Sequence, residues 1–215
     1  MATITDYASL QSTIADYLAR NDLTAKIPTF IQLAEAKFNR VLFVRQMEQR
    51  ATALVYPASD EPEYISLPLD FQSMRRVRLS SVSGKPRLDF RSGVQVDEYR
   101  QNTADVGGQP LYFTVFGDEI ELCPTPQDSY TIEMIYRKNI PSLSDSNTSN
   151  WLLALAPDAY LYGALLESAP YIKDDERIGT WATGLTTVID GLNNLGTVST
   201  FNAGPLEMRT SGRTP

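Results

Sequence analysis

The chain opens with two stretches in which apolar residues recur every three or four positions, which is the period of an amphipathic helix. The first stripe consists of Tyr7, Leu10, Ile14 and Tyr17. Thr5 is the expected N-cap of this helix, with Asp6 in its first turn. The second helix is expected to start near Thr24 and to tolerate Pro28 in its first turn. Its stripe consists of Ile27, Phe30 or Ile31, Ala34, Phe38 and Leu42. Residues 1–49 are therefore predicted to form a helical hairpin.

From about residue 50 the apolar period changes to two. Short runs such as YISLP, PRLDF and YTIEMIYRK are separated by Pro, Gly, Asp and Ser, which is typical of an antiparallel sheet with hairpins. The clearest hairpin joins residues 112–116 to 119–122, and Gly117 suits the first position of a type II′ turn. The segment SGVQVDEYRQN indicates a short helix capped by Ser92. Residues 50–141 are therefore assigned to an antiparallel β domain.

Beyond a polar loop at residues 142–150 the helical period returns. Pro157 is an expected first helical residue. The inward face of its helix consists of Tyr160 or Leu161, Ala164, Leu165, Ser168 and Ile172. The last helix carries a seam with steps of three and four, formed by Ile178, Trp181, Leu185, Val188, Leu192 and Leu195. Gly196 is expected to end this helix, and residues 197–215, rich in Thr, Ser, Gly and Pro, have no apolar period.

Each predicted hairpin buries one stripe only, so we expect the two hairpins to pack together, with the last seam against the N-terminal helices. The predicted fold is α+β. It comprises a four-helix bundle built from the N-terminal hairpin (1–49) and the C-terminal hairpin (142–196), an inserted antiparallel β domain (50–141) and an extended C-terminal arm (197–215).

Composition narrows the class of protein. The 215 residues are 42% hydrophobic and 21% charged, as in ordinary globular proteins, and no window holds the ~18 consecutive apolar residues that span a bilayer. The start MATITDYASL has no basic or apolar signal region, so we expect no secretory signal. The single cysteine, Cys123, is interpreted as a small buried hydrophobe.

Charge and the lack of histidine exclude several functions. A net charge of −7 disfavours general nucleic-acid binding, which needs a basic surface. With no His and one Cys, Ser-His and Cys-His nucleophile pairs and the usual zinc sites cannot be built. We therefore expect no catalytic residues, no metal and no cofactor.

One basic run is a candidate binding strip. It consists of Arg75, Arg76, Arg78, Lys85, Arg87 and Arg91, against the single acid Asp89. The run either meets a phosphate backbone or an acidic partner, or is the solvated face of a strand pair. Since neighbours in a strand point to opposite faces, at least one of Arg75 and Arg76 needs an acidic or aromatic neighbour. A subunit interface can supply it, which makes Arg75, Arg76 and Arg78 candidate interface residues.

Acidic and aromatic groups offer weaker signals. The acids fall into three groups: Asp60, Glu61 and Glu63; Asp118, Glu119 and Glu121; and Asp174, Asp175 and Glu176. None has the spacing of a calcium loop, and we interpret them as solvated acids. The aromatic residues Tyr112, Phe113, Phe116, Tyr130 and Tyr136 either stack on single-stranded nucleic acid or form core and cross-strand pairs.

The order of motifs resembles a known family. P-x-Y-F, a Gly turn, I-x-L-x-P-x-P, Y-T-I-x-M-x-Y, a polar loop ending in N-W-L-L, and A-P-D-A-Y-L-Y-G-A-L-L-E-S-A follow one another from residue 110. This order, and the opening helical pair ITDYASLQSTIADYLARNDLTAKIPTFIQLAEAKFNR, resemble the head-to-tail adaptor (connector, or head completion) proteins of tailed bacteriophages. The resemblance covers most of the chain.

The resemblance implies a structural virion protein made in the cytoplasm of a bacterial host. Such adaptors form a ring, commonly of twelve subunits, under the portal, with helices around the DNA channel and a tail or nozzle protein below. Their C-terminal arm commonly reaches the portal. By this resemblance, Phe201, Leu206, Met208 and Arg209 are assigned to portal binding, contact with genomic DNA is passive, and no membrane is involved.

Two other functions remain open at this point. One is a non-catalytic β-domain module on a helical stalk, binding carbohydrate or nucleic acid through the aromatic residues and the basic run. The other is a carboxylate-dependent hydrolase that uses Asp118, Glu119 or Glu121.

Overall fold

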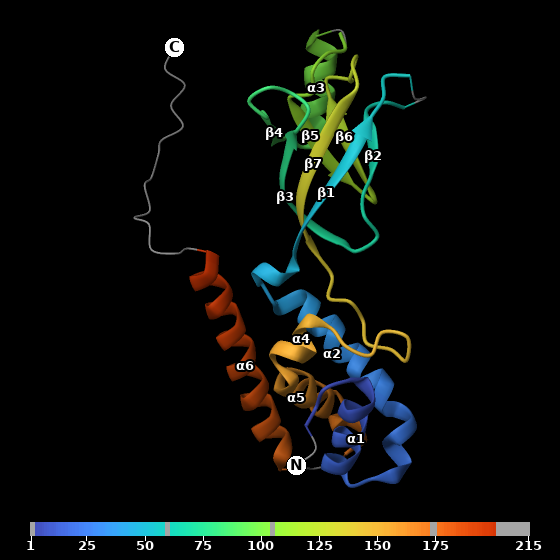
Figure 1. Ribbon diagram of the computed structural model, residues 1–215, viewed down its shortest axis with the longest axis vertical. Helices are drawn as coiled ribbons and strands as arrows, with labels where there is room; N and C mark the ends of the chain where they lie inside the picture. Colours follow the sequence, from blue (N-terminus) through green and yellow to red (C-terminus); the bar gives the residue numbers. More distant parts are fainter. Residues whose placement is uncertain (1–2, 59–60, 104–105, 173–175, 201–215) are drawn as a thin grey trace. The chain divides into compact units, whose positions relative to one another are not determined.

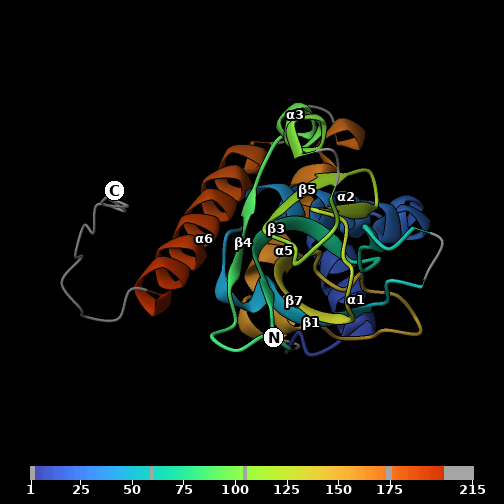
Figure 2. The ribbon, with the colours of Figure 1, turned by 90° about the horizontal axis from the view of Figure 1, so that it is seen from above.

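The computed structural model describes residues 3–58, 61–103, 106–172 and 176–200 (Figures 1 and 2). The chain divides into two compact units. A helical unit takes the residues up to Gln46 and from Ile140 onward, and a β unit takes residues 47–139. Each unit is described by itself.

The helical unit holds α1 (Tyr7–Leu18), α2 (Ile27–Val41), α4 (Trp151–Leu155), α5 (Pro157–Glu167) and α6 (Arg177–Thr200). Short 3-10 turns, η1 (Asn21–Lys26) and η3 (Ala169–Tyr171), join some of them, and η2 (Arg45–Met47) lies where the two units meet in the sequence. No helix among the described residues is both long and apolar enough to span a bilayer.

The N-terminus of α1 differs by one residue from the prediction. The N-cap is Asp6, not Thr5: its carboxylate accepts from the Ser9 backbone N–H at 2.8 Å, while the Ser9 hydroxyl accepts from the Asp6 backbone N–H at 3.0 Å. This reciprocal pair is a capping box. The last predicted stripe residue, Tyr17, is 43% exposed, and Leu18 is buried in its place.

The core of the helical unit forms where α5 packs on α2. The predicted stripe of α2, from Ile27 to Leu42, is buried, so this prediction is confirmed. Tyr160 meets the ring of Phe38 edge-on at 5.4 Å. A Cβ on Gly163 would lie 2.7 Å from the Phe38 ring, so only glycine permits this close approach of the two helices.

The last helix packs chiefly on α5 rather than on the N-terminal helices. Trp181 and Leu185 of its predicted seam are buried, whereas Leu195 is 60% exposed. The prediction that Gly196 ends the helix is wrong, because α6 continues to Thr200. A Cβ on Gly196 would lie 3.0 Å from the carbonyl oxygen of Phe43. This glycine therefore serves close packing and not termination.

The β unit is one seven-stranded, curved, barrel-like sheet (Figure 1). Its strands are β1 (Glu48–Val55), β2 (Tyr64–Ser66), β3 (Phe71–Leu79), β4 (Arg87–Phe90), β5 (Tyr112–Phe116), β6 (Glu119–Cys123) and β7 (Tyr130–Lys138). Their order is β1-β7-β3-β4-β5-β6-β2. Inward-facing apolar side chains fill it, among them Val77, Leu79, Ile120 and Ile132.

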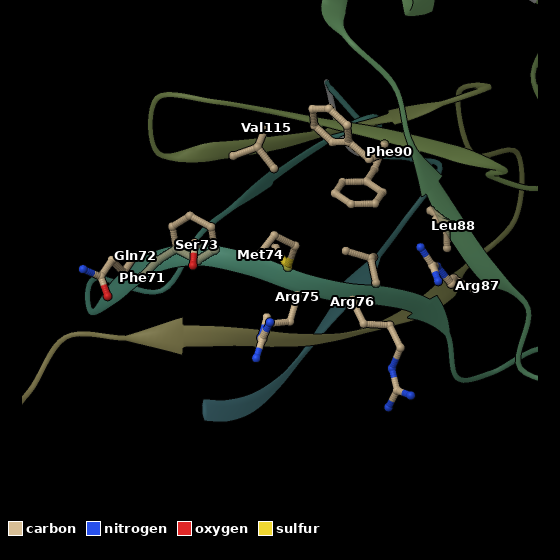
Figure 3. A pocket seen from close by; sticks show the side chains of 12 residues that line it. Phe71, Gln72, Ser73, Met74, Arg75, Arg76, Arg87, Leu88, Phe90 and Val115 are labelled. Carbon is tan, nitrogen blue, oxygen red and sulfur yellow. The ribbon is translucent and has the colours of Figure 1, made fainter. Parts of the chain in front are cut away.

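Strand β3 is bent by two bulges. It pairs antiparallel with β7, but the register skips Gln72 and Arg75, and each skipped residue increases the local twist. Arg75 and Arg76 therefore do not alternate. Figure 3 shows both arginines on the side of β3 away from Phe90. The prediction that they point to opposite faces is wrong, because the bulge was not visible in the sequence.

Strand β4 runs into α3 (Gly93–Thr103), which leads to β5 (Figure 2). Because α3 makes this crossover, β4 and β5 are parallel. Its buried residue is Val96, and its Arg100 forms an ion pair of 2.6 Å with Glu121 on β6. The β5–β6 hairpin is confirmed, with Gly117 at a φ of +53°.

The predicted fold class is wrong. Instead of a four-helix bundle with an inserted antiparallel domain, the described residues form a nearly closed seven-stranded sheet and six α-helices. The five-residue α4 is too short to show a helical stripe. The alternating runs predict hairpins between strands that are neighbours in the sequence. In the sheet, however, β7 lies between β1 and β3, which precede it by more than 50 residues, and β4 and β5 are parallel.

Candidate functional site

Two of the three candidate interface arginines are paired within their own sheet. Arg75 donates to a carboxylate oxygen of Glu48 at 2.9 Å. Arg78 forms an ion pair of 2.6 Å with Glu133. Arg76 is exposed and forms no ion pair among the described residues. Of the three, Arg76 is thus the cation that is open to a partner.

Glu133 lies at the centre of a small charge network on β7. Its side chain is 3% exposed and forms ion pairs with Arg50 at 2.9 Å and with Arg78. Burial works against ionisation, but the two guanidinium groups outweigh it and lower the pKa of Glu133. This network therefore links β1, β7 and β3 through ion pairs, and Glu133 compensates the charge of Arg78.

The rest of the basic run is spread over other features. Arg87 and Asp89 are 4.0 Å apart and both exposed. The guanidinium of Arg91 stacks over the ring of Tyr112, 4.6 Å from its centroid. Lys85 lies in the β3–β4 turn with a positive φ of 45°. The run is thus not a single continuous strip.

An apolar slot opens beside β3 (Figure 3). It has a volume of about 470 Å³. Its apolar walls come from Met74 and Val77 of β3, Leu88 and Phe90 of β4, and Phe113 and Val115 of β5. The sequence reasoning missed this slot, because it depends on which strands pair and not on any local motif.

The described acidic residues of the three groups lie on separate features of the β unit and in the turn before the last helix. Glu121 is engaged by Arg100, Glu119 lies in β6 and Asp118 in the turn before it. Among the described residues, no three His, Cys, Asp or Glu side chains are placed to hold a metal ion. Asp60, Asp174 and Asp175 lie outside the described residues.

The candidate stacking aromatics are divided between core and surface. Phe113, Tyr130 and Tyr136 are buried. The Tyr136 hydroxyl donates to Asp70 at 2.8 Å, and burial together with this carboxylate raises the pKa of Tyr136 to about 12. Phe116 is partly exposed and meets Tyr64 edge-on. These side chains therefore work as core and cross-strand pairs.

The proposed portal-binding residues Phe201, Leu206, Met208 and Arg209 lie outside the described residues.

The helical unit contains a buried polar network that the sequence reasoning missed. One carboxylate oxygen of Glu35 accepts from the Leu143 backbone N–H at 2.8 Å and from the Tyr160 hydroxyl at 3.0 Å. Asn150 donates to the same hydroxyl at 2.7 Å and to the Pro141 carbonyl oxygen at 2.7 Å. Burial raises the pKa of Glu35. The signal in the sequence was the position of Glu35 beside the apolar stripe of α2.

The exposed Arg76 and the apolar slot are surface features that can contact another macromolecule. This is the character of a structural or assembly protein. The family model described as SU10 adaptor protein matches residues 5–209, and the chain therefore belongs to the SU10 adaptor protein family. No curated protein matches the chain.

Family membership confirms the resemblance to head-to-tail adaptors of tailed bacteriophages. The chain is thus a bacteriophage structural adaptor, a class of virion protein that joins other head and tail components.

Proposed function

We propose that the chain forms a ring of twelve subunits under the portal, joins the DNA-filled capsid to the tail and lines the DNA exit channel. The observation that carries this proposal is the family match over residues 5–209, which is nearly the whole chain. A nozzle or other tail protein would dock below the ring.

Charge supports passive contact with the genome. The chain has 26 acidic and 19 basic residues, and several of the basic ones are held in ion pairs within the β unit. A surface of this kind repels phosphate rather than binding it, so DNA can pass without being retained. In this function the protein is not an enzyme and needs no cofactor.

The C-terminal arm is proposed to bind the portal. Beyond the last described helical residue, Phe201, Leu206 and Met208 are the sizeable apolar side chains, with Arg209 beside them. A segment this poor in core-forming residues gains its order from a partner rather than from its own packing. The apolar side chains would fill small pockets between portal subunits.

Arg76 is proposed to contribute to a contact with a neighbouring subunit or a tail protein. Arg75 and Arg78 would support it indirectly, since their own charges are compensated by Glu48 and Glu133. A carboxylate on the partner would then pair with Arg76 alone and not with all three arginines.

The experiment that tests the arm compares the full chain with a version that stops at Thr200, where α6 ends. Native mass measurement and electron microscopy of DNA-filled heads incubated with each protein give the readout. We expect the truncated protein to keep its circular dichroism spectrum and to lose attachment. Normal docking of the truncated protein would place the attachment surface in the folded units instead.

Passive contact with DNA has its own test. The purified subunit should bind duplex DNA weakly at physiological salt. Sub-micromolar binding that falls steeply with salt concentration would favour a nucleic-acid-binding module and contradict the proposed role of the negative charge.

A further inference from the structure

The slot beside β3 is a gap in the hydrogen-bonded ladder of the sheet. Strand β4 pairs with β3 only at Val77 and Arg78, and with β5 only at Tyr112 and Phe113. Beyond Phe90 the chain leaves for α3. Residues 73–76 of β3 and residues 114–116 of β5 therefore have no described strand on the sides that face each other. Two strand edges thus border one slot.

The inner face of the sheet is exposed at this gap. Leu88 and Phe90 alternate with Asp89, so both point to the core-facing side of β4. Leu88 is 1% exposed, whereas Phe90 is 62% exposed although it meets the ring of Phe113 at 5.6 Å. Met74 and Val115 complete the apolar floor. The slot therefore offers contacts for apolar side chains that enter from outside.

The outer face beside the slot carries two arginines, Arg76 and Arg87, against one acid, Asp89. Arg76 projects to the side of β3 away from Phe90 (Figure 3). An added strand would place its outward side chains next to Arg76, as directly opposed residues do in an antiparallel pair. Arg87 lies on β4 at the same end and is 4.0 Å from Asp89. The outward positions of an occupant therefore favour carboxylates.

We propose that the slot binds an extended segment of a partner protein, with apolar residues facing inward and acidic residues facing outward. The segment lies in the slot along the open side of β3 and runs antiparallel to it. Filling residues 73–76 takes about four residues, or roughly 13 Å of extended chain. Backbone hydrogen bonds supply binding energy, and the apolar floor and Arg76 supply selectivity, as in other cases of strand addition. The proposal does not depend on the ring or on the C-terminal arm.

Three labelled peptides separate the contributions. The probe is the acetylated and amidated peptide GEVEVEVG, measured by fluorescence polarisation against the full chain. The peptide GKVKVKVG reverses the charge with the same apolar pattern. The peptide GEVPVEVG keeps two of the three acids and the apolar pattern, and its central proline removes a backbone donor and disfavours the pairing. We expect saturable binding of the first peptide only.

Two variants test the location, each with a matched control. Arg76→Glu should weaken GEVEVEVG at least tenfold and improve GKVKVKVG, while Arg45→Glu, the same charge change on an exposed arginine outside the slot, should change neither. Val115→Trp should fill the slot and abolish binding, while Leu54→Trp on exposed β1 should not. Circular dichroism checks folding, and the Arg76 swap remains decisive if Val115→Trp unfolds.

Several outcomes overturn the proposal. One is that GEVEVEVG shows no saturable binding up to about 1 mM, which corresponds to a binding free energy weaker than about −4 kcal/mol. Another is equal binding of all three peptides. A third is that Val115→Trp dissociates a homo-oligomer while the peptide does not bind, which would assign the slot to a second copy of this chain.

Discussion

Replacing Tyr160 by Phe tests whether the buried polar network holds the helical unit together. The substitution keeps the ring that packs edge-on against Phe38 and removes only the hydroxyl. That hydroxyl donates to Glu35 at 3.0 Å and accepts from Asn150 at 2.7 Å. The variant therefore isolates two hydrogen bonds from the packing of the aromatic ring.

The expected cost follows from what each partner loses. Glu35 loses one of the donors to its buried carboxylate, and hydrogen bonds to charged groups contribute about 1.5–3 kcal/mol. Asn150 loses a neutral bond of about 0.5–1.5 kcal/mol but keeps its bond to Pro141. We expect the free energy of unfolding to fall by about 2–4 kcal/mol.

Urea denaturation followed by tryptophan fluorescence is the assay. The chain has two tryptophans, and both Trp151 and Trp181 lie in the helical unit, so the signal reports that unit. With a urea dependence of about 2 kcal/mol per molar, the midpoint should fall by roughly 1–2 M.

Tyr162→Phe is the matched control, two residues away on the same helix and only partly buried. Its free energy of unfolding should change by less than about 0.5 kcal/mol, as at ordinary surface positions. If Tyr160→Phe shifted the midpoint no more than Tyr162→Phe, the network would not stabilise the fold and the reasoning would fail.

Three further substitutions probe packing and charge in the helical unit. Leu185→Ala should cost about 2–5 kcal/mol in the urea assay because it leaves a cavity, while exposed Leu195→Ala should cost little; similar shifts would mean that α6 is not packed as described. Gly163→Ala should destabilise through its clash with Phe38, whereas Gly191→Ala, with open space around it, should stabilise by about 0.5–1 kcal/mol; the reverse order would contradict the close helix contact. The pKa of Glu35 is raised in the folded state, so the folded chain binds this proton more tightly than the unfolded chain does. The stability of the wild type should therefore fall, relative to that of Glu35→Gln, as pH rises from 4.5 through the raised pKa. Thermal melts between pH 4 and 8 that run parallel for the two proteins would refute this.

Features encoded by neighbouring residues could be predicted. The α2 stripe and the β5–β6 hairpin follow from local periodicity and from Gly117, and both are confirmed. The family resemblance, which depends on the order of such local motifs, is confirmed as well.

Features that depend on distant contacts could not be predicted. Gly196 has the appearance of a helix terminator, but its close neighbour is Phe43, far away in the sequence. The parallel pairing of β4 and β5 depends on α3 acting as a crossover. The slot depends on where β4 stops relative to its neighbours, which no alternation of apolar residues reveals.

The bulges in β3 make strand length a determinant of binding. Nine residues of β3 lie against residues 132–138 of β7, with Gln72 and Arg75 as the surplus. Deleting Arg75 would leave the registers on both sides of it unchanged, whereas deleting Val77 would move Arg78 toward a core position. The bend that parts β3 from β5 thus comes from the number of residues more than from their side chains. Insertions and deletions in this strand would change the width of the slot more than substitutions would.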